Sequence, residues 1–233
     1  LHARFAQFDG DDDLVFDAVL SDEPEDTMVI ATPWAEDPLA FYYNQKIVAM
    51  RARGSFKKGL LVHGFAPDDS FGLLDWGRGV WTRDNTWFWG VAQGWQDGQG
   101  GARPGSHCFG LNLGYGFGDT SAASENMAFV DGTCHKLHRV DFGIPEKTGG
   151  AHAKKTADRY QLMQPWHMTD DEGRLDLVFT PLLDRVDWMD FKLIRSDQHQ
   201  VFGRFDGTVT LDDGSTLPVS NLLGSAEVIH NVY

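Results

Sequence analysis

The sequence Val201-Phe-Gly-Arg-Phe-Asp-Gly-Thr-Val-Thr-Leu211 decides the fold class. Val201, Phe205 and Val209 fall on one side of the alternation, and the other side carries Arg, Asp and Thr residues. This period of two is typical of a β-strand in a sheet with two unlike faces. The run 175–180 repeats the pattern, so the C-terminal part of the chain predicts antiparallel sheet.

Strand-like segments recur at short spacing along the chain. Residues 212–215, Asp-Asp-Gly-Ser, predict a hairpin turn, because glycine tolerates a positive φ. No long window has a helical apolar stripe, and 145–157 predicts a loop or a short helix. This arrangement predicts an all-β barrel or sandwich. We expect further strands at 14–20, 27–31, 46–52, 70–76, 86–93, 107–113, 126–131, 133–142, 158–164, 188–195 and 222–230.

The charge of the chain is uneven. Its 233 residues carry a formal charge of −14, and the first forty supply −10 of it through eleven acidic residues and one basic residue. We therefore expect a solvated acidic edge there. Asp9-Gly-Asp-Asp-Asp13 could also form a Ca²⁺ loop, although it lacks the alternating ligands and closing Glu of an EF-hand.

Other features exclude several classes of protein. No apolar run reaches the ~20 residues of a membrane helix, and the N-terminus has no signal-peptide pattern. We therefore expect a cytoplasmic protein in which Cys108 and Cys134 are free thiols. Metal, P-loop and nucleophile-elbow motifs are absent, and no basic stripe suits nucleic acid. The sequence predicts no metal and no cofactor, and it leaves the oligomeric state open.

Glycine and tryptophan are concentrated in residues 64–118. Glycine lets backbones bend and approach closely, and tryptophan supplies a large rigid surface. Two interpretations remain open, namely barrel corners packed by aromatic residues or an aromatic-walled ligand cavity. The segment holds fourteen of the 26 glycines and five of the eight tryptophans, which are Trp76, Trp81, Trp87, Trp89 and Trp95.

The stretch Leu74-Asp-Trp-Gly-Arg-Gly-Val-Trp81 contains a carboxylate and a guanidinium group three residues apart. Asp75 and Arg78 could pair at the end of a strand, either to fix a turn or to bind substrate oxygens and tune an acid. The structural and the functional interpretation of this pair both remain open.

Three more polar residues lie in or directly before the predicted strands 107–113 and 126–131. Asn112 lies opposite apolar neighbours on 107–113, and the glycine run after it lacks the βαβ context of a dinucleotide site. Glu125 could be a general acid or base with Asn126 as an orienting group, or both could belong to an ordinary turn.

The histidines give weaker signals. His135 and His138 lie three apart, which on a strand places them on opposite faces and argues against a chelate. His199 shares a strand face with Val201 and Phe205. It is either a hydrogen-bonded core residue or, if that face lines a cavity, a group that transfers protons.

Taken in order, several segments resemble the uncharacterised, mainly bacterial family "domain of unknown function 2804". The resemblance runs from about residue 30 to the C-terminus. Its first segment adds Tyr43 and Lys46 as ligand-binding candidates. The segments are Tyr43-Asn-Gln-Lys46, Leu74-Asp-Trp-Gly-Arg-Gly-Val-Trp81, Gly110-Leu-Asn-Leu-Gly114, Ser124-Glu-Asn126, Leu177-Val-Phe-Thr-Pro181, His199-Gln-Val-Phe-Gly-Arg204 and Gly224-Ser-Ala-Glu227.

That family is similar to tandem lipocalin-like proteins such as carotenoid 1,2-hydratase and tocopherol cyclase. The resemblance implies two lipocalin-like (calycin) antiparallel β-barrels with an apolar cavity. Family members are longer at the N-terminus, so we expect residues 1–104 to form an incomplete first barrel and 105–233 a second barrel. A shared fold does not determine an activity.

Three functions compete. The first is hydration, cyclisation or isomerisation of a hydrophobic small molecule, in which a buried carboxylic acid protonates the substrate and tryptophan faces stabilise a cation. The second is binding of such a ligand without catalysis. The third is glycan binding or cleavage, which needs two carboxyl groups roughly 5–9.5 Å apart in an open groove. For the first, Asp75 or Glu125 would supply the proton, Trp76, Trp81, Trp87 and Trp89 would line the cavity, and Arg78, Asn112 and His199 would orient water or a polar head group.

Overall fold

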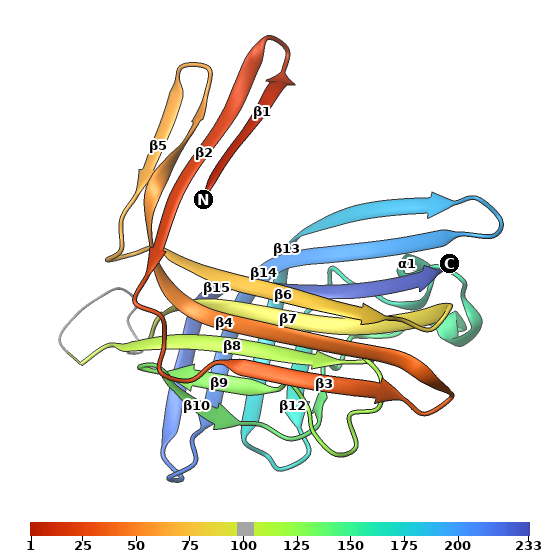
Figure 1. Cartoon of the computed structure of the whole chain (residues 1–233). Helices are drawn as coiled ribbons and strands as arrows, with labels where there is room; N and C mark the ends of the chain where they lie inside the picture. Colours follow the sequence, from red (N-terminus) through yellow and green to blue (C-terminus); the bar gives the residue numbers. More distant parts are fainter. Residues whose placement is uncertain (97–104) are drawn as a thin grey trace.

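The chain folds almost entirely into β-strands (Figure 1). The computed structural model describes residues 1–96 and 105–233. Within these ranges, six strands form sheet 1 and nine form sheet 2, and every strand pair is antiparallel. Both sheets are curled, and the predicted all-β class is confirmed.

The strands follow one another along the chain sheet by sheet. Sheet 1 contains β1 (His2–Asp9), β2 (Asp12–Ser21), β3 (Met28–Trp34), β4 (Asp37–Lys58), β5 (Leu61–Phe65) and β6 (Phe71–Val80). Sheet 2 contains β7 (Asp84–Gln96), β8 (His107–Tyr115), β9 (Met127–Val130), β10 (Thr133–Lys136), β11 (Val140–Asp141), β12 (Trp166–Asp170), β13 (Leu175–Asp190), β14 (Arg195–Thr210) and β15 (Thr216–Val232).

Two of the predicted strands are wrong, a third (133–142) is interrupted at 137–139, and the predicted loop and hairpin are confirmed. Residues 145–157 contain a 3₁₀ turn (Gly150–His152) and the start of helix α1 (Thr156–Arg159). Residues 158–164 end this helix and turn back toward β12, so they form no strand. Residues 188–195 span the tip of the β13–β14 hairpin, because the chain reverses at 191–194.

Strand β4 bends and so divides sheet 1 into a body and an arm. Its first half pairs with β3 and β6, and its second half pairs with β2 and β5. A bulge between Ile47 and Met50 shifts the register, and Ala49 there has a φ of 67°. The Ala49 N–H donates to Gln93 Oε1 of β7 at 2.8 Å, which anchors the bend on sheet 2. Beyond it, β4 projects from the body with β1, β2 and β5 (Figure 1).

At strands β7 and β8, both faces of sheet 2 are buried. Its inner face carries the apolar core, which includes the fully buried Phe109, Phe179 and Phe205. On the outer face, Trp89 and Val91 pack against residues of sheet 1 such as Tyr42. Strands β13 to β15 extend the sheet beyond this contact. The functional candidates therefore divide between an inner core and an interface between the sheets.

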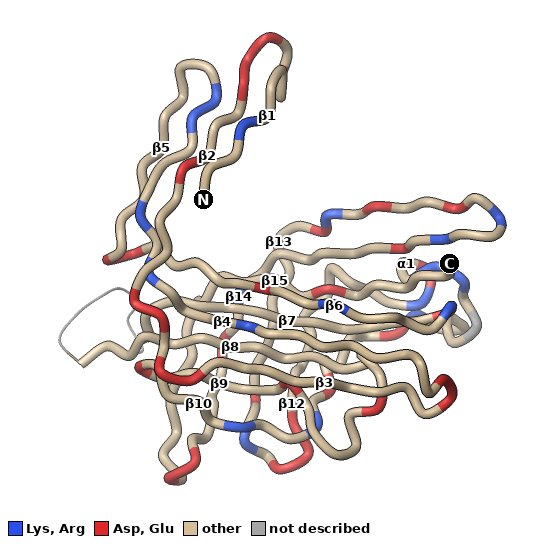
Figure 2. Tube along the Cα trace, in the orientation of Figure 1, with Lys and Arg blue, Asp and Glu red and all other residues tan. Residues whose placement is uncertain are grey.

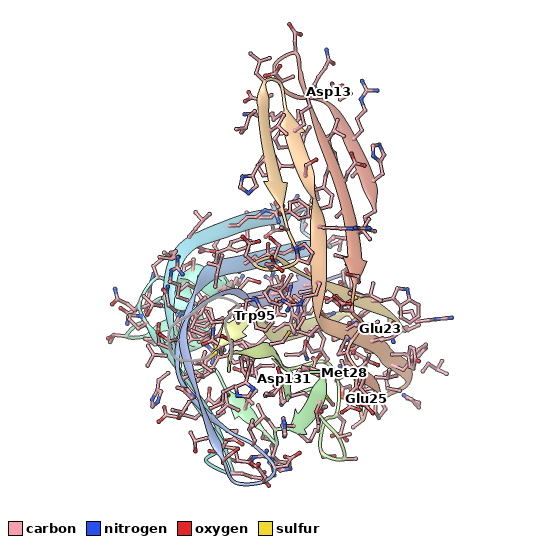
Figure 3. The ribbon with its side chains drawn as sticks, turned by 90° about the vertical axis from the view of Figure 1, so that its left-hand side faces the viewer. Asp13, Glu23, Glu25, Met28, Trp95 and Asp131 are labelled. Carbon is pink, nitrogen blue, oxygen red and sulfur yellow. The ribbon has the colours of Figure 1, made fainter. Side chains whose placement is uncertain are left out.

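The N-terminal acidic residues do not form one continuous edge, and Glu36 and Asp37 lie apart from the others at the β3–β4 turn (Figures 2 and 3). Asp13 lies near the tip of the β1–β2 hairpin, at the far end of the arm. Glu23 and Glu25 lie in the exposed connection to β3 and line one hollow with Asp131 of the β9–β10 turn (Figure 3). The expected acidic edge is therefore solvated but split between the arm and the body.

The change from sheet 1 to sheet 2 falls at residues 81–83, between β6 and β7. The predicted domain boundary after residue 104 lies outside the described residues, and the division into 1–104 and 105–233 stays a prediction. Cys108 and Cys134 are free thiols, as expected. In residues 1–96 and 105–233, no helix has both the length and the apolar composition to cross a bilayer.

Candidate functional site

Strand β4 directs a row of polar side chains at the outer face of sheet 2. Tyr42, Asn44 and Lys46 alternate with outward-facing residues, as the period of a strand requires. All three are buried, and Asn44 and Lys46 are only 1% and 2% exposed. A charged amine at this depth needs a partner to offset its lost hydration.

Lys46 has two such partners. Its Nζ forms an ion pair with Asp75 Oδ1, and Asp75 stands directly opposite Lys46 in the β4–β6 register. The same Nζ lies 4.5 Å from the centroid of the Trp89 ring, in cation–π contact. The Asp75 side chain is 37% exposed, so the pair connects the buried interface to solvent at the edge strand β6.

A chain of hydrogen bonds continues from Trp89 into sheet 2. Trp89 Nε1 donates to Asn112 Oδ1 at 2.9 Å. Asn112 Nδ2 donates to the Glu125 backbone carbonyl at 2.8 Å and to Glu125 Oε2 at 3.3 Å. Lys46, Trp89, Asn112 and Glu125 therefore form one connected group with Asp75, which we call the inter-sheet cluster.

Glu125 is the most deeply buried carboxyl group of this cluster, at 4% exposed. Burial raises its pKa above the usual range, and the charge of Asp75 raises it further. The charge of Lys46 and the hydrogen bond from Asn112 oppose this shift. The raised pKa favours the protonated form of Glu125, and the charge of Lys46 stabilises the carboxylate form once the proton has left.

Asn44 and Tyr42 extend the cluster along β4. A hydrogen bond between the Asn44 side chain and the neighbouring Tyr42 hydroxyl lowers the pKa of Tyr42, and the Asn44 amide has no other partner in the described part of the chain. Burial, followed by the charges of Asp75 and Glu125, raises the pKa of Tyr42. Tyr42 is thus neutral, and the Asn44 amide keeps hydrogen-bonding capacity beyond its contact with Tyr42.

An aromatic wall adjoins the cluster. The Tyr42 ring centroid lies 5.2 Å from that of Trp81 and 5.3 Å from that of Phe117. Trp87 stacks on Phe117 at 5.5 Å. Three of the predicted tryptophans, Trp81, Trp87 and Trp89, therefore gather at the interface between the sheets.

Asn126 lies beside the cluster and holds the backbone around it. Its Oδ1 accepts a hydrogen bond from the Gly114 N–H at 2.6 Å, and its Nδ2 donates to the His138 carbonyl at 2.8 Å. Both contacts are to backbone, so this side chain ties β8 to the segment before β11. The geometry gives Asn126 a supporting position.

Three predicted site residues lie on the opposite face of sheet 1. Tyr43 and Trp76 are exposed and meet edge-to-face at 5.9 Å. Arg78 stands opposite Tyr43 in the register and makes no ion pair with Asp75. The expected Asp75–Arg78 pair is wrong, because an odd separation on a strand turns the two side chains to opposite faces.

His199 lies apart from the cluster, on the inner face of sheet 2. Its Nδ1 is 2.7 Å from Asp184 Oδ2, and its Nε2 is 3.4 Å from Asp197 Oδ1. Burial lowers the pKa of His199, but these two carboxylates outweigh burial and raise it to about 9. His199 is therefore a cation buried between two carboxylates, as in the core interpretation of the sequence.

The sequence reasoning missed Asn44, Tyr42 and Glu227. Asn44 was visible as the third of a buried alternating set with Tyr42 and Lys46. Glu227 stands opposite Trp89 in the β15–β7 register, which no local pattern reveals. Among residues 1–96 and 105–233, no group of three His, Cys, Asp or Glu side chains is placed to hold a metal ion.

The fold and site define an all-β protein with a buried polar cluster between two curled sheets. The chain belongs to the family described as "Domain of unknown function (DUF2804)", whose family model matches residues 1–233. No curated protein matches the sequence. Among solved structures, the chain is similar to kievitone hydratase from Nectria haematococca, with 13% identity and a TM-score of 0.41. The match covers 100% of this chain and 64% of that one.

Proposed function

We propose that the protein binds a small, largely apolar molecule at the inter-sheet cluster and transfers a proton to it from Glu125. The observation that carries this proposal is the environment of Glu125, a buried carboxyl group with a raised pKa beside a buried lysine. Proton donors of this kind are kept neutral by burial until the substrate takes the proton.

The step requires no further reactant. Glu125 gives its proton to a carbon or oxygen atom of the substrate, and the resulting carboxylate is stabilised by the Lys46 ammonium group. Water then adds to the substrate cation in a hydration, or the cation loses a different proton in an isomerisation. Either path returns one proton to Glu125, so the residue ends as it began.

Deuterium transfer tests the proposal without knowledge of the substrate. The purified protein is incubated in D₂O with a small-molecule extract of the source cells, and deuterium uptake is followed by mass spectrometry. We expect at least one compound to gain deuterium with the wild-type protein and with the exposed control Glu36→Gln, but not with Glu125→Gln. Equal labelling by folded Glu125→Gln, or no labelling above the protein-free control, refutes proton transfer by this residue.

A second candidate function is binding without catalysis. The Asn44 amide favours it, because a buried amide with no partner besides the Tyr42 hydroxyl is stabilised by a ligand that completes its hydrogen bonds. Native mass spectrometry distinguishes the two functions. A bound compound that is recovered unlabelled after incubation in D₂O indicates a binding protein.

A further inference from the structure

A cleft of about 160 Å³ opens on the outer face of sheet 2, where sheet 1 does not cover it. Its floor is formed by buried or half-buried side chains, and its rim by exposed ones. The proposed proton transfer uses none of them. The cleft is lined by Trp87, Arg185, Asp187, Gln198, Gln200, Glu227 and Ile229.

A row of polar side chains crosses three strands along this cleft. Arg185, Gln200 and Glu227 stand opposite one another on β13, β14 and β15. Arg185 Nη1 donates to Gln200 Oε1 at 3.3 Å, and Gln200 Nε2 donates to Glu227 Oε1 at 2.8 Å. The row fixes the orientation of the Gln200 amide, which still has one N–H and one carbonyl lone pair for a ligand, and the Glu227 carboxyl group can accept further hydrogen bonds.

The cleft adjoins the inter-sheet cluster. Glu227 stands opposite Trp89, the indole that contacts Lys46. Burial raises the pKa of Glu227, and the charge of Asp75 acts in the same direction, while Gln200, Trp87 and Lys46 oppose the shift. The charges of Asp75 and Lys46 in the inter-sheet cluster therefore act on Glu227, so the cleft and the cluster are electrostatically coupled.

The lining favours a neutral ligand with hydroxyl groups. A hydroxyl group both donates and accepts, and it can meet an amide and a carboxyl group together. The indole of Trp87 provides a flat apolar surface for the C–H face of a ring. A ligand anion would face Glu227 and Asp187, whereas a ligand cation would face Arg185 and the nearby Lys46.

We propose that this cleft binds a neutral, hydroxyl-rich ring of the sugar type, with Gln200 and Glu227 as its hydrogen-bond partners and Trp87 beneath it. This inference rests on the proposed function, since it places the polar end of the ligand in the cleft and its apolar part toward Asp75 and the inter-sheet cluster. Gln200 and Glu227 are then specificity-determining residues.

Calorimetric titration with three matched probes tests the inference. Phenyl β-glucoside is neutral, phenyl β-glucuronide is anionic and phenyl β-glucosaminide is cationic. We expect the glucoside to bind at least tenfold more tightly than either charged probe. Gln200→Leu and Glu227→Leu should each weaken its binding at least tenfold, because a ligand hydroxyl loses its partner. The control Gln45→Leu, on the outer face of sheet 1, should bind as the wild type does.

Two further variants test the cleft without removing a buried side chain. Arg185→Met changes an exposed rim residue that cannot disturb the core, and it should weaken glucoside binding several-fold by freeing Gln200. Glu227→Gln keeps a hydrogen-bonding group and should retain most of the binding that Glu227→Leu loses. Equal binding of a charged probe, absence of glucoside binding, or unchanged binding by folded Gln200→Leu overturns the inference.

The outcome is separable from that of the proton-transfer proposal. The wild-type protein supplies both readouts, because deuterium transfer reports on Glu125 and glucoside binding reports on the cleft. Glucoside binding without deuterium transfer overturns only the proton transfer. Intact deuterium transfer without glucoside binding overturns only the cleft.

Discussion

The buried cation between Asp184 and Asp197 should make stability depend on pH in a definite direction. His199 is 2% exposed, and its pKa is raised from 6.5 to about 9. The folded protein therefore keeps this proton at pH values where the unfolded chain has released it. The stabilisation is fully present below pH 6.5 and is lost as the pH rises through 9.

The size of the effect follows from the two pKa values. Each pH unit between 6.5 and about 9 corresponds to about 1.4 kcal/mol, which gives about 3 kcal/mol in total. The variant His199→Gln removes the titrating group. The difference in free energy of unfolding between wild type and variant should therefore shrink by about 3 kcal/mol between pH 6.5 and pH 9.5.

Urea denaturation followed by tryptophan fluorescence measures this difference at each pH. His167→Gln is the matched control, because His167 pairs with Asp176 on the surface at 2.7 Å and is well exposed. Exposed pairs contribute little, so this variant should differ from the wild type by less than about 1 kcal/mol throughout. A gap between wild type and His199→Gln that stays constant across this pH range would refute a charged, buried His199.

Three further substitutions probe the inter-sheet cluster. Asp75→Asn leaves the buried Lys46 ammonium group without its counter-ion, and urea denaturation should show a loss of about 3 kcal/mol; unchanged stability would contradict the ion pair as a structural element. A Cβ atom at position 114 would collide with the Glu125 carboxyl group, so Gly114→Ala should displace that acid. Its deuterium transfer should fall and the pKa of Glu125 followed by carboxyl ¹³C NMR should change, whereas an unaltered titration would argue against this contact. Asn44→Leu removes a buried amide that has no partner besides the Tyr42 hydroxyl and should raise the free energy of unfolding by about 1–3 kcal/mol while weakening ligand binding; a lower Tm would indicate that the amide is satisfied.

The sequence predicted strands best where burial imposes alternation. In β14, Val201, Phe205 and Val209 all enter the core of sheet 2, so the pattern and the fold agree. The predicted strand 188–195 runs through a hairpin tip. Because Phe191 and Leu193 are apolar, the sequence predicts buried strand residues there, but both are exposed. Strands β1 and β5 lie on the arm and lack a consistently buried side, and their sequences show no alternation.

The candidate site was predictable as residue types but not as an arrangement. Asp75, Glu125 and Asn112 were identified from their polar character among apolar and glycine-rich strands, and the structure brings them together. The partner of Asp75 was not identified, because ion pairs across strands depend on register. Lys46 and Asp75 lie 29 residues apart, and only the β4–β6 pairing reveals that they face each other.

The double coverage of β7 and β8 has a consequence for how this protein tolerates change. Their inner faces pack into the core of sheet 2, and their outer faces meet sheet 1, so few positions on them accept a larger or more polar side chain. The hairpin tip at 191–194 is exposed throughout. Labels, tags and inserted loops belong at that tip, where added residues displace only solvent.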